Sequence, residues 1–470
     1  MASDVLEIRY NDEQVRFPAR LLDKLDVAGP RYTSYPTAPE WTERFGPREM
    51  AETLDQSNQG SPAPLSLYMH LPFCERLCLF CGCNVVIDRK RSMGAPYLER
   101  LKGEIDRVAR RLDPARPVVQ FHWGGGTPTY FPPAELEDLF EHTRSRFRFD
   151  PEAEIGVEVD PRVTTPEHVR TLRRLGFNRL SMGVQDFESI VQQTVRRIQP
   201  YAATKDLLDL GRAEGFQSVN ADLIYGLPHQ SVDSFARTLE LVIAMNPDRV
   251  AMYSYAHVPW LKKQQGSFAR FVPKGREKFR LFALGLERFT RAGYRFIGFD
   301  HFARPGDELS LAQDDRTLTR NFQGYSTRAG ADLVGFGVTA ISGVGRTYAQ
   351  NFRDLASYER RLDAGELATM RGMRLDEDDV IRRDVITRIL CHCRLRKSDI
   401  EGEHGIDFDR YFAAELERLG ELERDGLVRL AADEIAVTLL GRLFLRVVGM
   451  VFDVYLRRRE STQPLYSKTV

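Results

Sequence analysis

The feature that most constrains this chain is the segment Cys74-Glu75-Arg76-Leu77-Cys78-Leu79-Phe80-Cys81-Gly82-Cys83-Asn84, which carries four of its six cysteines. Three thiolates at this spacing can bind one iron–sulfur cluster from a single loop. Zinc is the alternative metal, with Cys83 or a distant residue as the fourth ligand. Zinc motifs usually add a second cysteine pair or a histidine pair, and neither occurs within the next hundred residues. The segment therefore favours an iron–sulfur cluster over zinc. A disulfide framework is weaker still, because no cysteine follows for more than 300 residues.

The length and charge of the chain exclude several functional classes. Its 470 residues indicate two or three domains, of which a (β/α) barrel would take about 250 residues. Lys plus Arg and Asp plus Glu both number 67, so no net field attracts nucleic acid or an anionic membrane. No signal-peptide pattern is present, and Arg442, Arg446 and Asp453 interrupt the most apolar run, 439–456, which we expect to be a core helix. These features predict a cytoplasmic protein without nucleic acid or membrane partners.

The central part of the chain alternates short β-rich runs with longer amphipathic segments, which is typical of βαβ units and a parallel sheet. The predicted strands are 65–70, 118–122, 154–159, 179–183, 218–223, 249–255 and 294–298. The predicted helices are 97–112, 133–147, 166–175, 202–214, 232–244 and 276–292. The predicted fold class is therefore α/β, a partial or complete TIM-like (β/α) barrel with its functional groups at the carboxyl ends of the strands.

Two further regions flank this barrel, which we place at residues 64–348. Residues 1–63 are expected to form an arm, because the segment 29–37 contains a glycine and two prolines that favour extended or turning backbone. Residues 349–470 are expected to form a mainly helical domain. An amphipathic helix at 408–425, a strand–turn–strand and a final long helix indicate a winged-helix-like unit. Its mixed charge favours a packing or lid role over DNA binding.

Residues suited to ligand binding follow each predicted strand. The first strand leads into the cysteine segment, and the second leads into Trp123-Gly124-Gly125-Gly126-Thr127-Pro128-Thr129, where glycines let a ligand approach the backbone. Glu158, Gln185 and Asp222 lie at later strand ends, and Arg197 could bind a carboxylate in a bidentate manner. Each of these side chains alone is more often solvated or paired, but together they predict a polar ligand site.

The pattern Cys-x3-Cys-x-Phe-Cys after a strand resembles the radical S-adenosylmethionine (SAM) superfamily. In that superfamily three cysteines hold a [4Fe-4S] cluster and SAM chelates the fourth iron. The extension Gly82-Cys83-Asn84 and the segment 29–37 are similar to the oxygen-independent coproporphyrinogen III oxidases within it. This resemblance implies that Cys74, Cys78 and Cys81 are the cluster ligands. Spacing alone does not exclude Cys83, whose assignment as a non-ligand comes from the resemblance.

The same resemblance implies a set of SAM-binding residues. The glycine-rich turn would hold the methionine amine, and Glu158 and Arg197 would hold the methionine end of SAM on the cluster. A second SAM molecule is also implied. The implied contacts are Tyr68, Phe80, Gly125, Gly126, Thr127, Glu158, Gln185, Arg197, Asp222, Ala256 and Ile341.

The implied activity is oxidative decarboxylation of two propionates of coproporphyrinogen III to vinyl groups, which gives protoporphyrinogen IX in anaerobic haem biosynthesis. The oxidoreductase would act as a monomer with an unidentified electron donor and acceptor. The alternatives are a haem-trafficking or haem-methylating radical SAM relative, or a zinc-binding structural protein. Trafficking relatives usually lack both Cys83-Asn84 and the string Arg31 to Thr37, and this chain has both.

Several other side chains are weaker candidates. The four propionates of a coproporphyrinogen need cationic or backbone donors, and Arg31, Arg304 and Arg320 are the candidates for binding them. Asp300 and His301 could form a proton relay, although a histidine beside apolar residues is more often structural. Cys391 and Cys393 are expected to be buried or half-buried free thiols.

Overall fold

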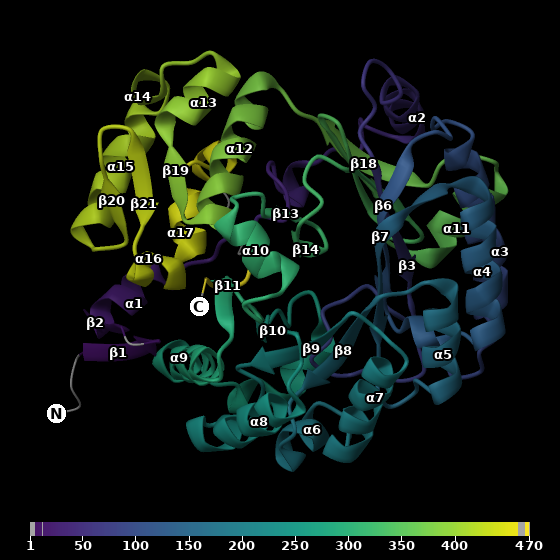
Figure 1. Cartoon of the computed structure of the whole chain (residues 1–470), viewed down its shortest axis with the longest axis horizontal. Coiled ribbons are helices and arrows are strands. Elements are labelled where there is room, and N and C mark those ends of the chain that lie inside the picture. Colours follow the sequence, from purple (N-terminus) through teal and green to yellow (C-terminus); the bar gives the residue numbers. More distant parts are fainter. Residues whose placement is uncertain (1–4, 12, 459–465, 470) are drawn as a thin grey trace.

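The computed structural model describes residues 5–11, 13–458 and 466–469, and its centre is a curved sheet with helices along its outer face (Figure 1). Six parallel strands form the middle of this sheet: β3 (Leu65–Leu71), β6 (Pro117–Gly125), β7 (Arg148–Val159), β8 (Arg179–Gln185), β9 (Ser218–Tyr225) and β10 (Arg249–Ser254). Each strand pairs in parallel with the next one along the chain. The carboxyl ends of all six therefore lie along one edge, as predicted.

The sheet is a partial barrel rather than a closed one. The remaining strands are β11 (Arg295–Gly298), β12 (His301–Ala303), β15 (Asp332–Phe336), β16 (Ile341–Val344), β17 (Thr347–Asn351) and β18 (Thr369–Arg374). The strand order is β11-β12-β10-β9-β8-β7-β6-β3-β15-β16-β17-β18, in which β3 and β10 do not pair with each other. The predicted fold class is confirmed, in its partial form.

The connecting helices occur where the sequence predicts them. They are α3 (Gly94–Ala109), α4 (Pro133–Arg146), α5 (Pro166–Leu175), α7 (Tyr201–Ala213), α8 (Val232–Met245) and α9 (Gly275–Arg291). Local signals set their ends. The hydroxyl of Thr165 caps α5 by accepting the His168 N–H, and Ser231 caps α8 in the same way through Ser234. Proline occupies the first turn of α4 and α5, where its missing N–H costs nothing.

Aromatic packing between the helices and the sheet fixes the end of β6. Trp123 is fully buried, with its ring centroid 4.7 Å from that of Phe177 and 5.9 Å from that of Phe140. Burial of such a side chain stabilises the fold by about 2–3 kcal/mol. The glycine-rich turn begins at the next residue, so this packing holds the turn in place at the open edge of the sheet.

The sheet extends further along the chain than the sequence pattern indicates. Strands β16, β17 and β18 add to it in antiparallel fashion, although the charged, helix-like composition after about residue 351 gave no sign of β18. The short β17 spans residue 348, where we placed the barrel boundary, and the sheet continues to Arg374. A pattern of three short, partly charged strands is too weak to distinguish from loops by periodicity.

The carboxyl-terminal region contains the predicted helix–hairpin unit. It consists of α12 (Glu377–His392), β19 (Arg394–Arg396), α13 (Lys397–His404), α14 (Phe408–Tyr411), α15 (Ala413–Arg424), β20 (Val428–Leu430) and β21 (Glu434–Val437). Strands β19, β21 and β20 form a small antiparallel sheet in that order. None of the helices in the described part of the chain is long and apolar enough to cross a membrane.

The prediction of a single long helix at 439–456 is wrong. Three short helices occupy this run: α16 (Leu439–Leu443), α17 (Leu445–Met450) and α18 (Val454–Arg458). A Cβ atom at Gly441 would lie 1.9 Å from the carbonyl oxygen of Leu427, so α16 packs directly on backbone. The carboxylate of Asp453 accepts the N–H groups of Tyr455 and Leu456, which starts a new helix.

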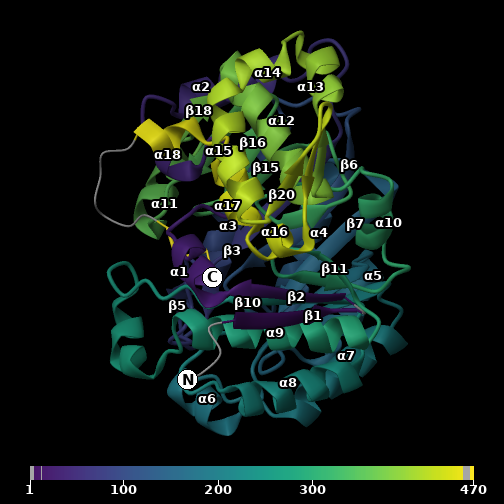
Figure 2. The same cartoon turned by 90° about the vertical axis from the view of Figure 1, so that its left-hand side faces the viewer.

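The amino-terminal arm is more structured than the sequence suggests. It contains the hairpin β1 (Val5–Tyr10) and β2 (Glu13–Pro18), then α1 (Ala19–Leu25) and α2 (Pro47–Gln56). Phe17 packs against Phe279 of α9 and Phe444, which places the hairpin along α9 (Figure 2). Beyond α1 the arm pairs with the other end of the chain, because the Gly29 N–H donates to the Ser467 carbonyl and the Thr469 N–H donates to the Val27 carbonyl.

Candidate active site

The cysteine segment lies at the carboxyl end of β3, over the open edge of the sheet. Cys74 ends the short strand β4 (Phe73–Cys74), which pairs with β5 (Val86–Ile87). Cys74, Cys78, Cys81 and Cys83 all line one cavity of about 440 Å³, and all are free thiols. The cavity has a size that suits a small-molecule ligand.

Three side chains hold the outer half of this loop by its carbonyl groups. Lys262 Nζ donates to the Cys83 carbonyl at 2.7 Å, Gln264 Nε2 to Cys81 at 3.3 Å, and Gln265 Nε2 to Phe80 at 3.0 Å. We call Lys262, Gln264 and Gln265 the carbonyl clamp. Gln265 is fully buried, so its hydrogen bond is shielded from water. The sequence showed only a charged segment here, and no local pattern marks residues that act about 180 positions away.

Two guanidinium groups lie beside the thiol of Cys78. Arg162 Nη2 is 3.2 Å and Arg197 Nη1 is 3.6 Å from Cys78 Sγ. Both arginines also bind Asp160, at 2.6 Å and 3.0 Å. Burial raises the pKa of Asp160, but the charges of Arg197 and Arg162 outweigh it and lower the pKa to about 2. Asp160 therefore holds both guanidinium groups against the second cysteine of the segment.

The glycine-rich turn fits tightly against the start of the cysteine segment. Gly125 has φ +117°, and a Cβ atom there would lie 2.8 Å from the His70 ring. A Cβ atom at Gly126 would lie 2.5 Å from the Pro72 carbonyl oxygen. Only glycine can occupy both positions. The Thr127 hydroxyl is 3.3 Å from Cys74 Sγ, so the turn and the first cysteine share one wall of the cavity.

Two carboxyl groups, those of Glu158 and Asp222, face the same cavity, and their pKa values are shifted in opposite directions. The Gly125 N–H donates to Glu158 at 3.2 Å, and His122 Nε2 lies 3.7 Å from this carboxylate. Desolvation raises the pKa of Glu158, but these neighbours lower it below its ordinary value, so the group is ionised at neutral pH. In contrast, desolvation and then the charge of Glu158 raise the pKa of Asp222 to about 7.

Most of the SAM contacts implied by the resemblance lie together. Nine of them line the cysteine cavity: Phe80, Gly125, Gly126, Thr127, Glu158, Gln185, Arg197, Asp222 and Ala256. Tyr68 is outside the lining of this cavity, and its ring is stacked on that of His122 with the ring centroids 6.2 Å apart. Ile341 lies further away, in a small apolar cluster with Trp41 and Tyr348.

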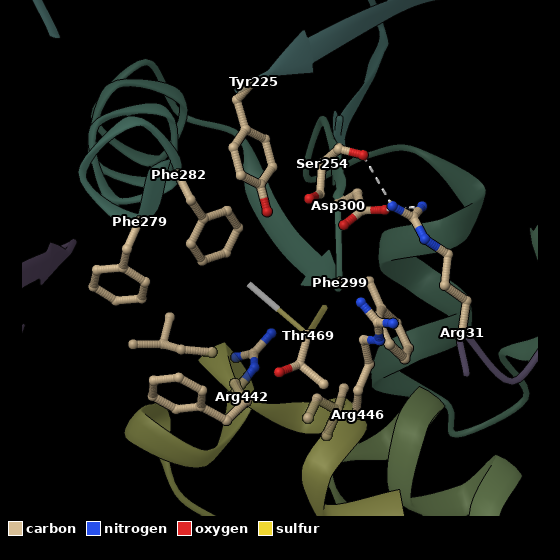
Figure 3. A pocket seen from close by; sticks show the side chains of 13 residues that line it. Arg31, Tyr225, Ser254, Phe279, Phe282, Phe299, Asp300, Arg442, Arg446 and Thr469 are labelled. Atoms are coloured by element: carbon tan, nitrogen blue, oxygen red, sulfur yellow. Dashed lines mark hydrogen bonds and ion pairs between the residues drawn. The ribbon is translucent and has the colours of Figure 1, made fainter. Parts of the chain in front are cut away.

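The arm reaches this cavity through Arg31. Its guanidinium binds Asp300 at 2.9 Å and the Ser254 carbonyl at 3.2 Å. Arg31 and Ser254 also line a second, smaller cavity of about 30 Å³ between the arm, α9 and α16 (Figure 3). There the buried Arg446 donates to the Pro30 carbonyl, and burial followed by repulsion from Arg31 lowers its pKa to about 10. The arm is thus fastened beside the cysteine cavity by the half-buried Arg31 and the buried Arg446.

Other candidates from the sequence lie apart from this site or act differently. Asp300 binds Arg31, and no hydrogen bond joins it to His301, so the suggested relay is not formed. Arg304 donates to the Ala292 carbonyl and stacks on Tyr294, just before β11. Its backbone N–H donates to the carbonyl of Asp248, just before β10, so it lies at the other end of the barrel. Cys391 is buried and Cys393 half-buried, both as free thiols at the end of α12, as expected.

Comparisons with known proteins agree with this geometry. Residues 68–242 match the family model of the radical SAM superfamily, and residues 375–444 match the model of the HemN C-terminal domain. An oxygen-independent coproporphyrinogen III oxidase of Pseudomonas aeruginosa is 45% identical over 447 residues, which is 94% of this chain and 97% of the relative. One of Synechocystis sp. is 42% identical over 461 residues, or 97% and 98% of the two chains.

A solved structure agrees over the same length. The coproporphyrinogen III oxidase of Escherichia coli, described as a radical SAM enzyme, superimposes with a TM-score of 0.89 at 43% identity, covering 96% of this chain and 100% of that one. The likeness therefore includes the arm, the barrel and the carboxyl-terminal region.

Proposed function

The chain belongs to the oxygen-independent coproporphyrinogen III oxidases, and on this basis we propose that Cys74, Cys78 and Cys81 bind its [4Fe-4S] cluster. The enzyme converts two propionates of coproporphyrinogen III to vinyl groups, giving protoporphyrinogen IX in anaerobic haem biosynthesis. Its cofactors are the cluster and SAM. The observation that carries the proposal is that three thiols and nine of the implied SAM contacts line one cavity at the carboxyl ends of the strands.

The donors in this cavity suit an iron–sulfur cluster. Soft thiolates favour iron–sulfur over hard cations, and the guanidinium groups of Arg162 and Arg197 lie within 3.6 Å of Cys78 Sγ. We propose that Cys83 is not a ligand. This assignment follows the three-cysteine pattern of the family, because the Cys83 thiol lines the same cavity as the other three. It leaves three thiols for iron and one iron for SAM.

The remaining polar groups suit the methionine end of SAM. Arg197 Nε is buried without a hydrogen-bond partner, so a donor is available for the carboxylate of a ligand. Glu158 is ionised and can accept from the ammonium group, beside the backbone of Gly125 and Gly126. We assign Asp222 to the ribose hydroxyls, because its carboxylate lines the cavity and is held by Asn220 and Ser181.

A bound cluster and SAM would supply radical chemistry that takes a hydrogen atom from a propionate β-carbon, and loss of CO2 and one electron would then leave a vinyl group. The chain's own residues position the reactants and exclude water. Arg197 and Glu158 orient SAM, the glycine-rich turn allows its close approach, and Arg31 holds the arm over the cavity. We propose a second SAM near Phe80, Gln185 and Ala256, with Ile341 on its far side.

The remaining proposals concern the domain boundaries of the enzyme, its cellular location, its oligomeric state and its electron partners. We propose that the arm spans residues 1–63 and that the carboxyl-terminal domain begins after β18, with the barrel between them. This boundary follows the end of the sheet and the start of the matched carboxyl-terminal model. We further propose a cytoplasmic monomer that exchanges electrons with a separate donor and acceptor. A reducing compartment suits six free cysteines.

The test is anaerobic reconstitution with iron and sulfide, followed by incubation with SAM, a reductant and coproporphyrinogen III. We expect 5'-deoxyadenosine and a divinyl tetrapyrrole. Replacement of Cys74, Cys78 or Cys81 by alanine should abolish both, whereas Cys391→Ala, a buried thiol outside the cavity, should retain them. A methylated tetrapyrrole would indicate a methyltransferase, intact haem transfer would indicate a trafficking protein, and stoichiometric zinc without labile sulfide would exclude the radical chemistry.

A further inference from the structure

The structure distinguishes the three arginines that the sequence offered for substrate carboxylates. Arg304 donates to the Ala292 carbonyl at the opposite end of the barrel. Arg31 already forms an ion pair with Asp300. Arg320 differs from both, because two of its guanidinium nitrogens, Nε and Nη1, are buried without any hydrogen-bond partner among the described residues.

Arg320 is held in place by aromatic rings rather than by an anion. It lies on β13 (Thr319–Asn321), which forms a hairpin with β14 (Gly324–Ser326). Its Cζ is 4.6 Å from the ring centroid of Phe299 and 4.8 Å from that of Tyr325. These contacts stabilise the charge through the ring faces, but they leave the N–H groups without acceptors. Arg320 as a residue is half-buried, and its Nε and Nη1 atoms are shielded from water.

Two neighbouring residues also have buried polar atoms without partners. These atoms are His301 Nδ1 and Gln323 Nε2. The His301 ring meets Tyr325 edge to face at 5.3 Å and Tyr253 at 5.8 Å. Tyr253 lines the cysteine cavity, so this group of residues lies next to the proposed reaction site. Burial and the charge of Arg320 lower the pKa of His301 to about 3, which leaves Arg320 as the charged group of the pair.

A buried guanidinium without an acceptor is costly for the folded protein unless a ligand supplies one. A carboxylate is the matching group, because it can accept two parallel N–H donors from one guanidinium. We propose that Arg320 binds a propionate carboxylate of the tetrapyrrole, with His301 and Gln323 as additional hydrogen-bonding groups and with Phe299 and Tyr325 holding the guanidinium in position. This assignment rests on the proposed function, since it takes the tetrapyrrole as the substrate.

Equilibrium binding tests the assignment without turnover. The probe is coproporphyrin III, the oxidised tetracarboxylate, titrated into the reconstituted enzyme and followed by porphyrin fluorescence. Arg320→Met should raise the Kd by at least about tenfold, since charged hydrogen bonds of this kind contribute on that scale. Arg320→Lys should restore part of the affinity. Arg304→Met removes the same charge at the other end of the barrel and should bind coproporphyrin III as the wild type does.

The tetramethyl ester of coproporphyrin III is the matched ligand control. It has no carboxylate, so the Arg320 proposal expects wild type and Arg320→Met to bind it equally. An equal loss of affinity for acid and ester would instead show that the side chain shapes the pocket and would overturn the assignment. Unchanged affinity for the acid in both Arg320→Met and Arg320→Lys would overturn it too.

Kinetics separate this proposal from the function on which it rests. In Arg320→Met we expect a raised KM for coproporphyrinogen III with much less change in cluster content or in cleavage of SAM without substrate. If the wild type forms the divinyl product and Arg320→Met keeps its KM, the carboxylate assignment fails and the function stands. If the wild type forms no such product, the function fails whatever Arg320 does.

Discussion

Asp160 and Arg197 form a buried ion pair, 3.0 Å between Oδ2 and Nη1, directly against the thiol of Cys78. The pair ties a cluster ligand to the residue proposed to bind the carboxylate of SAM. Asp160 also binds Arg162, so one carboxylate balances two guanidinium groups. Removing that carboxylate would leave two buried cations beside the thiol, without a counter-charge.

Asp160→Asn should therefore destabilise the cluster-free protein by about 3–5 kcal/mol, as expected when one partner of a buried pair is lost. Urea unfolding measures this change. Asp106→Asn, which breaks an exposed pair with Arg146, should cost less than about 1 kcal/mol. Because the pKa of Asp160 is lowered to about 2, its contribution is complete at neutral pH and falls only below about pH 4. Equal stability of the two variants at pH 7 would contradict this account.

The carbonyl clamp should be needed to keep the cysteine loop closed. In Lys262→Met the Cys83 carbonyl loses its donor, so we expect faster hydrogen exchange at residues 78–84 of the cluster-free protein and less iron per chain after reconstitution. Gln265→Leu should act more strongly because its hydrogen bond is buried. At roughly 1 kcal/mol for its bond, Lys262→Met should increase loop opening about fivefold, and Gln265→Leu should increase it further.

Lys263 provides the matched control for the clamp. It is the next residue, carries the same charge and is exposed. Lys263→Met should leave both the exchange rates and the iron content at the wild-type level. If Lys262→Met and Lys263→Met behaved alike, the hydrogen bond to Cys83 would have no role in holding the loop.

The glycine-rich turn should not tolerate the smallest side chain. In Gly126→Ala the new Cβ would meet two backbone carbonyl oxygens at 2.5 and 2.7 Å, those of Pro72 and Phe73. We expect a loss of about 1–3 kcal/mol in stability and loss of SAM binding, measured by thermal unfolding and calorimetry. Gly402→Ala, on α13 and with open space around it, should change neither quantity.

Binding of SAM should depend on pH through Asp222. Its pKa is raised to about 7, so the carboxylate proposed for the ribose hydroxyls forms only as the pH rises through neutrality. The affinity of the reconstituted enzyme for SAM should increase by up to roughly tenfold between pH 6 and pH 8, measured by calorimetry. Asp222→Asn should bind SAM more weakly and with a flat profile over this range. A wild-type profile that is already flat would exclude this role.

Local sequence pattern was enough to predict the parallel strands, the six main helices and the cysteine loop, because each depends on periodicity or spacing within a few residues. It was not enough for the carbonyl clamp, whose partners lie about 180 positions away, or for the pairing of Asp160 with Arg197, 37 positions further along the chain. The broken final helix shows the same limit. Its apolar run reads as one helix, whereas Gly441 and Asp453 adopt their roles only through packing and capping in the folded chain.

The same limit applies within the candidate site. The sequence offered Arg31, Arg304 and Arg320 as equivalent cations, and nothing in their neighbours distinguished them. The folded structure shows how they differ: Arg31 is paired with Asp300, Arg304 lies at the other end of the barrel, and two nitrogens of Arg320 have no acceptor. The sequence shows which residues are charged. Whether a charged side chain can bind a ligand depends on the whole tertiary structure.

The pairing between the arm and residues 466–469 has a consequence for biosynthesis. The Val27 N–H donates to the hydroxyl of Thr469, 442 positions further along the chain. The second partner is made 442 positions after the first, so the arm cannot pair with it until nearly the whole of the described chain has been synthesised. Arg31 lies on this arm and lines the cysteine cavity, so this part of the cavity wall is completed late.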